Sequence, residues 1–474
     1  MPGTTIRSGP TRSDGDSPQF HESVNRTRVR TIPPPMANDH LDPRRQILFM
    51  SLAVAATLPG VFLRLTGTHP DPIVAAICYG LAIVGAAFIL SWAAEVIQLD
   101  IAAGLALALL ALIAILPEYA VDFVFTAKAG QEFAASGDAS RYGPLALANM
   151  TGGNQLLIGL GWPMVILIGT WRVRKAGARP EDAEQTTSTQ ITLARSQSVD
   201  IAYLTVASLY GLTLFLKQTL SPLDAVVLVA IYALYLRRLS GAPPGVPHLV
   251  GPSAYIGTLP KRARRIANYS MFVVSAAVIL LCAEPFAESI IELGEAIGVS
   301  EFLLVKWIAP TASEAPELLV ATLFAWRLAS RTGLGALISS KVNQWTLLVG
   351  TLPVVFSIFS GALHGLPLDR VQRVELFVTA AQSVFAVAIV ASRSVTRNEA
   401  WVMLGLFVAQ LAESGLAELG HISEEASAQA RIGVGIVFLL AGAWVLRKDF
   451  RAFVVNVRDG LRTPWSELVV EEKV

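Results

Sequence analysis

Residues 306–353 read KWIAPTASEAPELLVATLFAWRLASRTGLGALISSKVNQWTLLVGTLP. Two apolar segments flank a short basic turn, and each is long enough to cross a bilayer. The first segment carries Glu314 and Glu317 beside prolines, and the second carries Lys341 near its centre. A charge at the centre of a membrane costs about 2.5–3.5 kcal/mol on insertion scales, so it is usually retained for a function. The stretch therefore predicts two membrane helices with functional charges in mid-span.

The composition of the whole chain agrees with a membrane protein. Of its 474 residues, 53% are hydrophobic and 15% are charged, whereas soluble proteins carry about 25% charged residues. We therefore predict an all-α polytopic membrane protein whose main partner is the lipid bilayer. The net charge of +1 provides no overall field that would attract nucleic acid, so no nucleic-acid partner is expected. No pattern favours a particular oligomeric state.

Several classes of site are disfavoured by the residues that the spans contain. Cys78 and Cys282 both fall in apolar segments, which is typical of buried free thiols. All six histidines lie outside the predicted spans, which argues against a histidine-ligated metal centre in the membrane. No P-loop or dinucleotide-binding fingerprint is present. Transport would therefore not be driven by ATP hydrolysis on this chain, and no cofactor is expected.

About 12 apolar segments come close to the ~20 residues that a membrane helix needs. We place these spans at about 46–66, 72–97, 100–128, 142–171, 199–217, 222–238, 267–292, 300–328, 334–360, 371–392, 399–417 and 432–447.

The distribution of basic residues predicts the orientation of the spans. Most lysines and arginines fall in alternate loops, including the run KRARR at 261–265. By the positive-inside rule, both termini lie in the cytoplasm, and the plasma membrane is the expected location. The KRARR run is expected to be an ordinary topology signal, with a lipid or regulatory site as the alternative. Lys306 is expected to extend to the outer surface, and Glu413 and Glu418 to lie at the membrane interface.

The polar helix pair has an earlier counterpart in the chain. Pro117-Glu118 matches Pro316-Glu317, and Asn154-Gln155 matches Asn343-Gln344. The matching helices lie five spans apart, and an odd number of spans inverts the direction of a helix in the membrane. Inverted repeats with broken helices that meet near the midplane are typical of secondary transporters. The sequence therefore predicts two inverted five-helix repeats with one extra helix at each end.

This interpretation divides the chain into seven parts. They are a disordered cytoplasmic tail (1–45), an extra helix (46–66), the first repeat (72–238), a cytoplasmic basic loop (239–266), the second repeat (267–417), a further extra helix (432–447) and a cytoplasmic tail (448–474).

The residue types in the repeats suit a hard cation. Pro117 and Pro316 each remove a backbone donor and free a carbonyl group one turn back. Such carbonyls are tolerated in lipid only where protein or an ion satisfies them. Calcium prefers six to eight oxygen ligands, which carboxylates beside freed carbonyls can provide. The candidate ion ligands are Glu118, Glu317, Glu314, Asn154, Asn343, Ser339 and Thr151.

At these residues the chain resembles the sodium/calcium exchanger family. The resemblance implies two inverted five-helix halves, with Glu118 and Glu317 as paired central carboxylates that bind transported calcium or sodium. It also implies that each half contains an alpha repeat, a Pro-Glu helix followed by an Asn-bearing second helix. Asn154 and Asn343 would be ligands from this second helix in each repeat. The family usually writes Gly-Thr-Ser-x-Pro-Glu, whereas this chain has Ile113, Ala114 and Ile115 in the first repeat and Ala312, Ser313 and Glu314 in the second. The chain therefore resembles a divergent member.

Two further residues suggest how ion binding is coupled to charge. The Lys341 ammonium could fill part of the space of a bound cation, paired with Glu314 or Glu317. Asp122, one turn after Glu118, could share a proton with it.

The function predicted from these residues is secondary antiport without enzymatic activity. Calcium or another cation would be exchanged for sodium or protons by alternating access, and these ions would bind only transiently. The alternative on the same fold is sodium/proton exchange. A membrane-embedded hydrolase is less favoured because the spans lack histidine, and a channel is less favoured because both repeats keep their charges.

Overall fold

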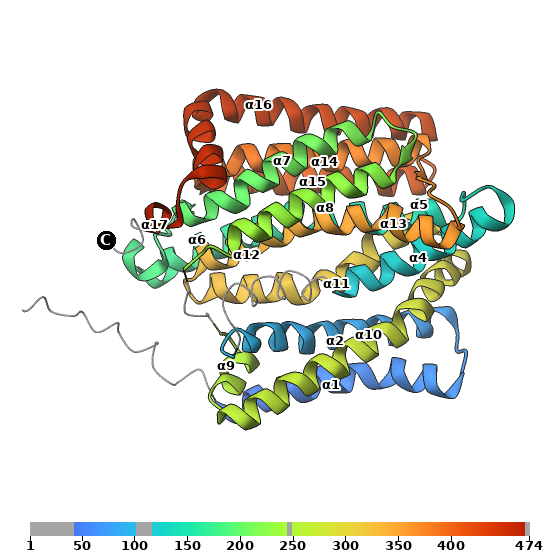
Figure 1. Cartoon of the computed structure of the whole chain (residues 1–474), viewed down its shortest axis with the longest axis horizontal. Helices are drawn as coiled ribbons and strands as arrows, with labels where there is room; N and C mark the ends of the chain where they lie inside the picture. Colours follow the sequence, from blue (N-terminus) through green and yellow to red (C-terminus); the bar gives the residue numbers. More distant parts are fainter. Residues whose placement is uncertain (1–41, 101–115, 244–248, 470–474) are drawn as a thin grey trace, which may run out of the picture. The chain divides into compact units, whose positions relative to one another are not determined.

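In a computed structural model of the chain, residues 42–100, 116–243 and 249–469 are described. Long helices make up nearly all of this part (Figure 1). The helices are α1 (Pro43–Thr66), α2 (Pro72–Ile97), α4 (Leu116–Ser136), α5 (Tyr142–Leu156), α6 (Trp162–Ala176), α7 (Ser198–Leu214), α8 (Pro222–Leu239), α9 (Pro252–Gly257), α10 (Lys261–Ile297), α11 (Glu301–Trp326), α12 (Ser330–Asn343), α13 (Val349–Ser360), α14 (Arg370–Val390), α15 (Arg397–Glu418), α16 (Glu424–Arg462) and α17 (Trp465–Leu468).

Among the described residues, eight helical stretches are long and apolar enough to cross a membrane. These are α1, α2, α5 continued by α6, α10, α12 continued by α13, α14, α15 and α16. Four more helices, α4, α7, α8 and α11, coincide with predicted spans but are shorter or more polar. The predicted span at 100–128 lies partly outside the described residues, which resume where α4 begins. The prediction of an all-α polytopic protein is confirmed.

Two helices extend beyond the predicted membrane spans. The KRARR run at 261–265 belongs to the first turns of α10 rather than to the predicted loop 239–266. The last predicted span ends at 447, next to a kink at Asp449, and a second helical segment of α16 continues from there to Arg462. The end of α16 packs closely against α7, where a Cβ on Gly460 would lie 2.1 Å from the Ser198 carbonyl oxygen. Residues 448–462, which were predicted as part of a polar tail, are therefore helical and packed against the protein. Most of the predicted tail 1–45 lies outside the described residues.

Apolar side chains that face outward mark the lipid-facing surface. Phe62 and Leu65 of α1 are 61% and 73% exposed, and Val273 and Leu280 of α10 are 69% and 67% exposed. Large apolar side chains exposed in rows along long helices are stable only in contact with lipid or another protein. The chain is therefore an integral membrane protein.

Close contacts through glycine show that α5 and α11 run in the same direction. A Cβ on Gly152 would lie 1.8 Å from the Lys306 carbonyl oxygen, and a Cβ on Gly161 would lie 2.6 Å from the side chain of Leu318. Residue numbers therefore increase along both helices from one contact to the next. Only glycine lets the two backbones approach so closely.

The remaining two helices of the polar pairs, α4 from the first repeat and α12 continued by α13 from the second, are also parallel. The Tyr119 hydroxyl of α4 donates to Asn343 Oδ1 at 3.3 Å, and further along α4 a Cβ on Gly130 would lie 2.9 Å from the Phe356 carbonyl oxygen. Because α4 and α5 form an antiparallel hairpin, as do α11 and α12, these contacts orient α4 opposite to α11. The two Pro-Glu helices are thus inverted, as the sequence predicts.

Two small antiparallel sheets repeat the same symmetry. Strand β1 (Gln190–Thr192) pairs with β4 (Ser394–Thr396), and β2 (Thr219–Leu220) pairs with β3 (Leu366–Pro367). Strands β1 and β3 lie in equivalent connections of the two repeats, as do β4 and β2. The second helix of each repeat also contains a five-residue π-helical segment, η2 (Leu157–Gly161) and η5 (Gln344–Leu348). Short π-helical segments are often found at functional sites.

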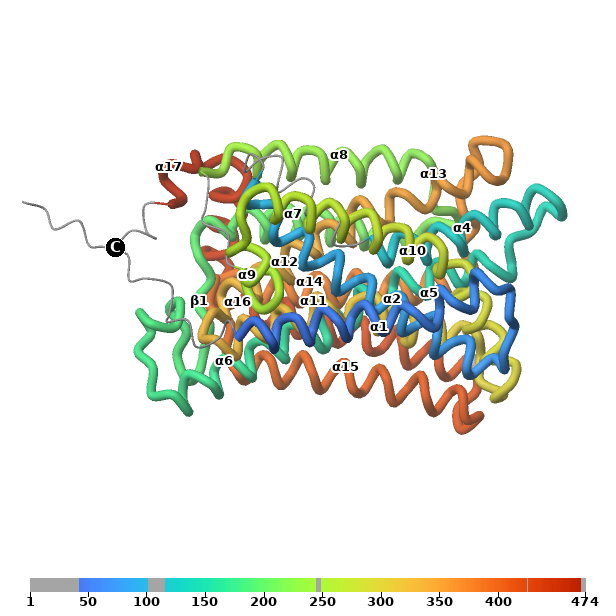
Figure 2. The backbone as a smooth tube through the Cα atoms, turned by 90° about the horizontal axis from the view of Figure 1, so that it is seen from below, coloured from blue at the N-terminus to red at the C-terminus, as the bar shows by residue number. Residues whose placement is uncertain are grey.

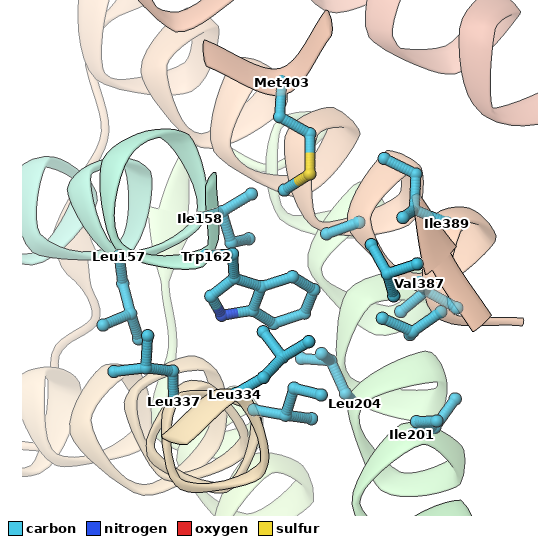
Figure 3. Packing of buried hydrophobic residues seen from close by; sticks show 14 of the residues in the cluster. Leu157, Ile158, Trp162, Ile201, Leu204, Leu334, Leu337, Val387, Ile389 and Met403 are labelled. Carbon is cyan, nitrogen blue, oxygen red and sulfur yellow. The ribbon is translucent and has the colours of Figure 1, made fainter. Parts of the chain in front are cut away.

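The extra helices flank the repeats. Helix α1 packs on α2 and α10, and α16 packs on α7 and α14 (Figure 1). Figure 2 shows α8 and α15, the last helices of the two repeats, on opposite sides. A large apolar cluster around the fully buried Trp162 fills the space between α6, α7, α12, α14 and α15 (Figure 3). Leu204, Leu334, Leu337 and Met403 surround its indole ring.

Candidate ion-binding site

Three carboxyl groups come together from the two inverted repeats. Glu118 lies in the first turn of α4, and Glu314 and Glu317 lie in the middle of α11. The Glu118 carboxyl group lies close enough to Glu317 and Glu314 to interact with both electrostatically. Glu118 is 4% exposed and Glu314 is fully buried. Two buried carboxylates at close range repel each other when both are ionised, and a bound cation or a proton relieves that repulsion.

The second helix of the second repeat donates hydrogen bonds to these carboxyl groups. The Ser340 hydroxyl donates to Glu317 Oε2 at 2.7 Å, and the Gln344 amide donates to Glu314 Oε1. Sequence reasoning did not select Ser340 or Gln344 as site residues. Their spacing of four residues, which places them on one face of a helix, is the signal that could have found them.

Lys341 is fully buried, and its partner is Asn154 of the other repeat. The ammonium group donates to the Asn154 side-chain oxygen and to the Asn154 carbonyl oxygen, the latter at 3.0 Å. It also lies 5.2 Å from the centre of the Trp345 ring. The predicted ion pair with Glu314 or Glu317 is not formed in this structure, because the hydrogen bonds of Lys341 go to Asn154. The Lys341 ammonium group nevertheless places a positive charge between the second helices of both repeats.

Three other predicted ligands have protein partners. Asn343 accepts from the Tyr119 hydroxyl, so it faces the first Pro-Glu helix. The Thr151 hydroxyl donates to a carbonyl of its own helix at 2.7 Å. Ser339 lies 2.7 Å from the Tyr235 hydroxyl of α8. The structure therefore directs Asn343 toward α4 and Ser339 toward α8.

Asp122 forms a separate buried pair one turn beyond Glu118. Its Oδ1 accepts from the Asn149 amide at 2.7 Å, and both side chains are 2% exposed. Sequence reasoning missed Asn149. Pro117 and Pro316 both lie within helices, directly before Glu118 and Glu317.

A second group of buried charges lies earlier on α11, about two turns before Glu314. Lys306 forms an ion pair with Glu375 Oε2 at 2.6 Å and is 1% exposed, so the expectation that it extends to the surface is wrong. Arg431 binds Glu375 Oε1 at 3.0 Å and Glu413 at 3.2 Å. Glu413 is 8% exposed, so it is buried within the protein, and its interfacial depth stays a prediction. We call Lys306, Glu375, Arg431 and Glu413 the four-charge chain.

The family model of the sodium/calcium exchanger protein matches residues 72–240 and 268–414. The crystal structure of the H+/Ca2+ exchanger CAX is similar with 35% identity and a TM-score of 0.78, over 88% of this chain and 98% of that chain. The Ca2+/H+ antiporter protein YfkE is similar in fold, with 16% identity and a TM-score of 0.53, over 83% and 99% of the two chains. No curated protein matches the sequence. These matches, together with the inverted Pro-Glu helices, show that the chain belongs to the sodium/calcium exchanger family.

Proposed function

We propose that this exchanger moves calcium against protons by alternating access. The observation that carries the proposal is that the buried carboxyl groups of Glu118 on α4 and Glu314 on α11 come together where the two repeats meet, and we propose that they share a proton when no calcium is bound. The 35% identity to an H+/Ca2+ exchanger supports the same pair of ions. Sodium is the alternative counter-ion, and sodium/proton exchange is the alternative function.

Competition for the same oxygens provides the coupling. Calcium binds ionised carboxylates, so its entry requires that the proton shared by Glu118 and Glu314 leave. Return of the proton removes a ligand and releases calcium. Glu317, which is half-buried and oriented by Ser340, adds a third carboxylate. Asn343 contributes an amide oxygen from the second helix. Because protons and calcium exclude each other at one site, the site returns across the membrane with one or the other.

Lys341 and Asp122 are proposed to set the charge balance of the exchange. The Lys341 ammonium remains with the protein and offsets one carboxylate charge, so fewer transported charges are needed to neutralise the site. Asp122, held by Asn149, provides a proton-linked group one turn from Glu118. Asn154 acts by holding Lys341. Thr151 and Ser339 stay predictions as ion ligands.

The cellular setting is part of the proposal. We place the protein in the plasma membrane with both termini in the cytoplasm, because basic residues are concentrated in the alternate loops. Transported cations bind transiently, and we propose no cofactor, no nucleic-acid partner and no enzymatic activity.

Calcium uptake into proteoliposomes tests the function. Uptake is measured under an imposed proton gradient and, separately, under a sodium gradient, for the wild type and for Glu317→Gln. We expect uptake under the proton gradient and its loss in Glu317→Gln, while Glu295→Gln, which changes a 65% exposed carboxylate, stays active. Calcium uptake under the sodium gradient alone would show that sodium, and not the proton, is the counter-ion. No calcium uptake under either gradient would reject calcium and favour sodium/proton exchange.

A further inference from the structure

The four-charge chain crosses from α11 to α16 within the helix bundle. Its members alternate in sign, from Lys306 of α11 to Glu375 of α14, Arg431 of α16 and Glu413 of α15. The side chains are 1%, 2%, 15% and 8% exposed, in that order. Buried charges are tolerated when each is paired and hydrogen-bonded. Two cations balance two carboxylates here, so no net charge remains to attract a transported cation.

Glu375 joins the two parallel helices that approach the ion site. One of its oxygens, Oε2, accepts from Lys306 of α11 at 2.6 Å and from the Gln155 amide of α5 at 3.2 Å. The same two helices touch where a Cβ on Gly152 would lie 1.8 Å from the Lys306 carbonyl oxygen. A single carboxylate oxygen therefore fixes α5 against α11 at their closest contact.

This contact lies next to the ion site along both helices. Gln155 follows Asn154, which holds Lys341. On α11, Glu314 lies about two turns beyond Lys306, and its carboxyl oxygen would be 3.5 Å from a Cβ on Gly153. A shift of α5 along α11 would move Asn154 and Glu314 relative to each other. In enzymes, a misplacement of about 1 Å caused by a remote mutation can cost about a hundredfold in rate, and we expect displaced ion ligands to weaken cation binding in the same way.

One member of the four-charge chain, Arg431, comes from outside the family repeats. Arg431 belongs to α16, and the family model ends at residue 414. Arg431 occupies Glu375 Oε1, so Oε2 is left to Lys306 and Gln155. Figure 1 shows α16 lying along α14, the helix that carries Glu375.

We infer that Glu375, held by Arg431, is a positioning residue for the ion site, and that the extra helix α16 thereby takes part in setting the affinity for the cation. This inference rests on the proposed exchange function. It assigns no ion contact to the four-charge chain, because its effect passes through α5 and α11.

A pair of charge-neutral double variants tests the inference. Glu375→Gln/Arg431→Gln removes one buried charge of each sign between α14 and α16. Arg370→Gln/Glu425→Gln does the same between the same two helices at the surface, where the ion pair has side chains 58% and 56% exposed. We expect the buried double variant to raise KM for calcium about tenfold at similar folded protein and Vmax. We expect the surface double variant to keep the wild-type KM.

An unchanged KM in a folded Glu375→Gln/Arg431→Gln protein would overturn the inference, as would an equal rise in the surface double variant. If the buried double variant does not accumulate in membranes, Arg431→Lys decides, because it keeps the charge but loses the two-sided contact. A KM raised at least threefold supports the inference, and a wild-type KM overturns it. If the wild type exchanges sodium for protons instead of calcium, the proposed function fails, and the same variants are compared by KM for sodium.

Discussion

At the scale of single residues, Lys341 distinguishes this site most clearly from a set of oxygen ligands. Its ammonium group is fully buried, bound by Asn154, and near enough to Glu314 to interact with it electrostatically. The Lys341 charge stays with the protein and offsets one carboxylate. In Lys341→Met this offset is lost, so the transported ions should have to provide one more positive charge to neutralise the site. We expect the variant to change the dependence of calcium uptake on membrane potential, whereas Lys341→Arg should keep it.

The measurement is calcium uptake into proteoliposomes in which potassium and valinomycin set the potential. The same potential dependence in wild type and Lys341→Met would exclude a role for Lys341 in charge balance.

Neighbouring serines give a second prediction at this scale. Ser340 donates to Glu317 at 2.7 Å, whereas Ser339 contacts Tyr235. A hydrogen bond to a charged group contributes about 1.5–3 kcal/mol, and the lower end applies because Glu317 is half-buried. Ser340→Ala should therefore raise KM for calcium about tenfold, and Ser339→Ala should have a smaller effect. A larger effect of Ser339→Ala in uptake assays would show that Ser339, as first predicted, is the ligand.

The residues that sequence reasoning found and missed differ in how local their signals are. Glu118 and Glu317 stand out because each follows a proline within an apolar segment and the pattern occurs twice. Glu375 and Arg431 give no such signal, because Glu375 meets Lys306 from 69 residues away. That pairing depends on how α11, α14 and α16 pack, which a pattern within one segment does not contain.

At the scale of helices, the contact between α5 and α11 depends on Gly152. A Cβ there would lie 1.8 Å from the Lys306 carbonyl oxygen, and a backbone atom has no room to move aside. A Cβ on Gly153 would meet its nearest neighbours at 3.5 and 3.6 Å, an ordinary contact distance. Overpacking of a tight interface costs about 1–3 kcal/mol or more.

Gly152→Ala should therefore lower the amount of folded protein in membranes and its unfolding temperature, while Gly153→Ala should leave both close to wild type. Size-exclusion profiles and thermal unfolding in detergent provide the measurement. Equal stability of the two variants would contradict the close approach of α5 and α11.

Helices were predictable where apolar runs are long, and their ends were less so. Apart from the span at 100–128, which lies partly outside the described residues, each predicted span overlaps a helix, since a run of about 20 apolar residues has few other stable forms in lipid. The ends of α10 and α16 were missed because both helices continue into charged segments. Tertiary contacts, such as the ion pair of Arg195 with Asp459 at 3.0 Å, stabilise the end of α16.

At the scale of the molecule, the inverted repeat followed from counting spans, and the structure confirms it. The pairing of β1 with β4 and of β2 with β3 could not be predicted, because strands of two or three residues carry no pattern of their own. Each strand forms only when its partner strand, from a loop of the other repeat, lies beside it. The sheets thus depend on the assembled repeats.

The two sheets lie at opposite ends of α7, because β1 precedes this helix and β2 follows it. Arg195, Arg331 and Arg393 line the hollow beside β1 and β4, so the positive-inside rule predicts that this sheet faces the cytoplasm. Cysteines introduced at exposed positions near each sheet test this orientation. In a background with Cys78→Ala and Cys282→Ala, Leu363→Cys should react with a membrane-impermeant maleimide in intact cells, and Thr189→Cys should react only after lysis. The reverse labelling pattern would place both termini outside the cell. The face of the ion site predicted to open to the cytoplasm would then open to the outside, where the calcium and proton concentrations differ.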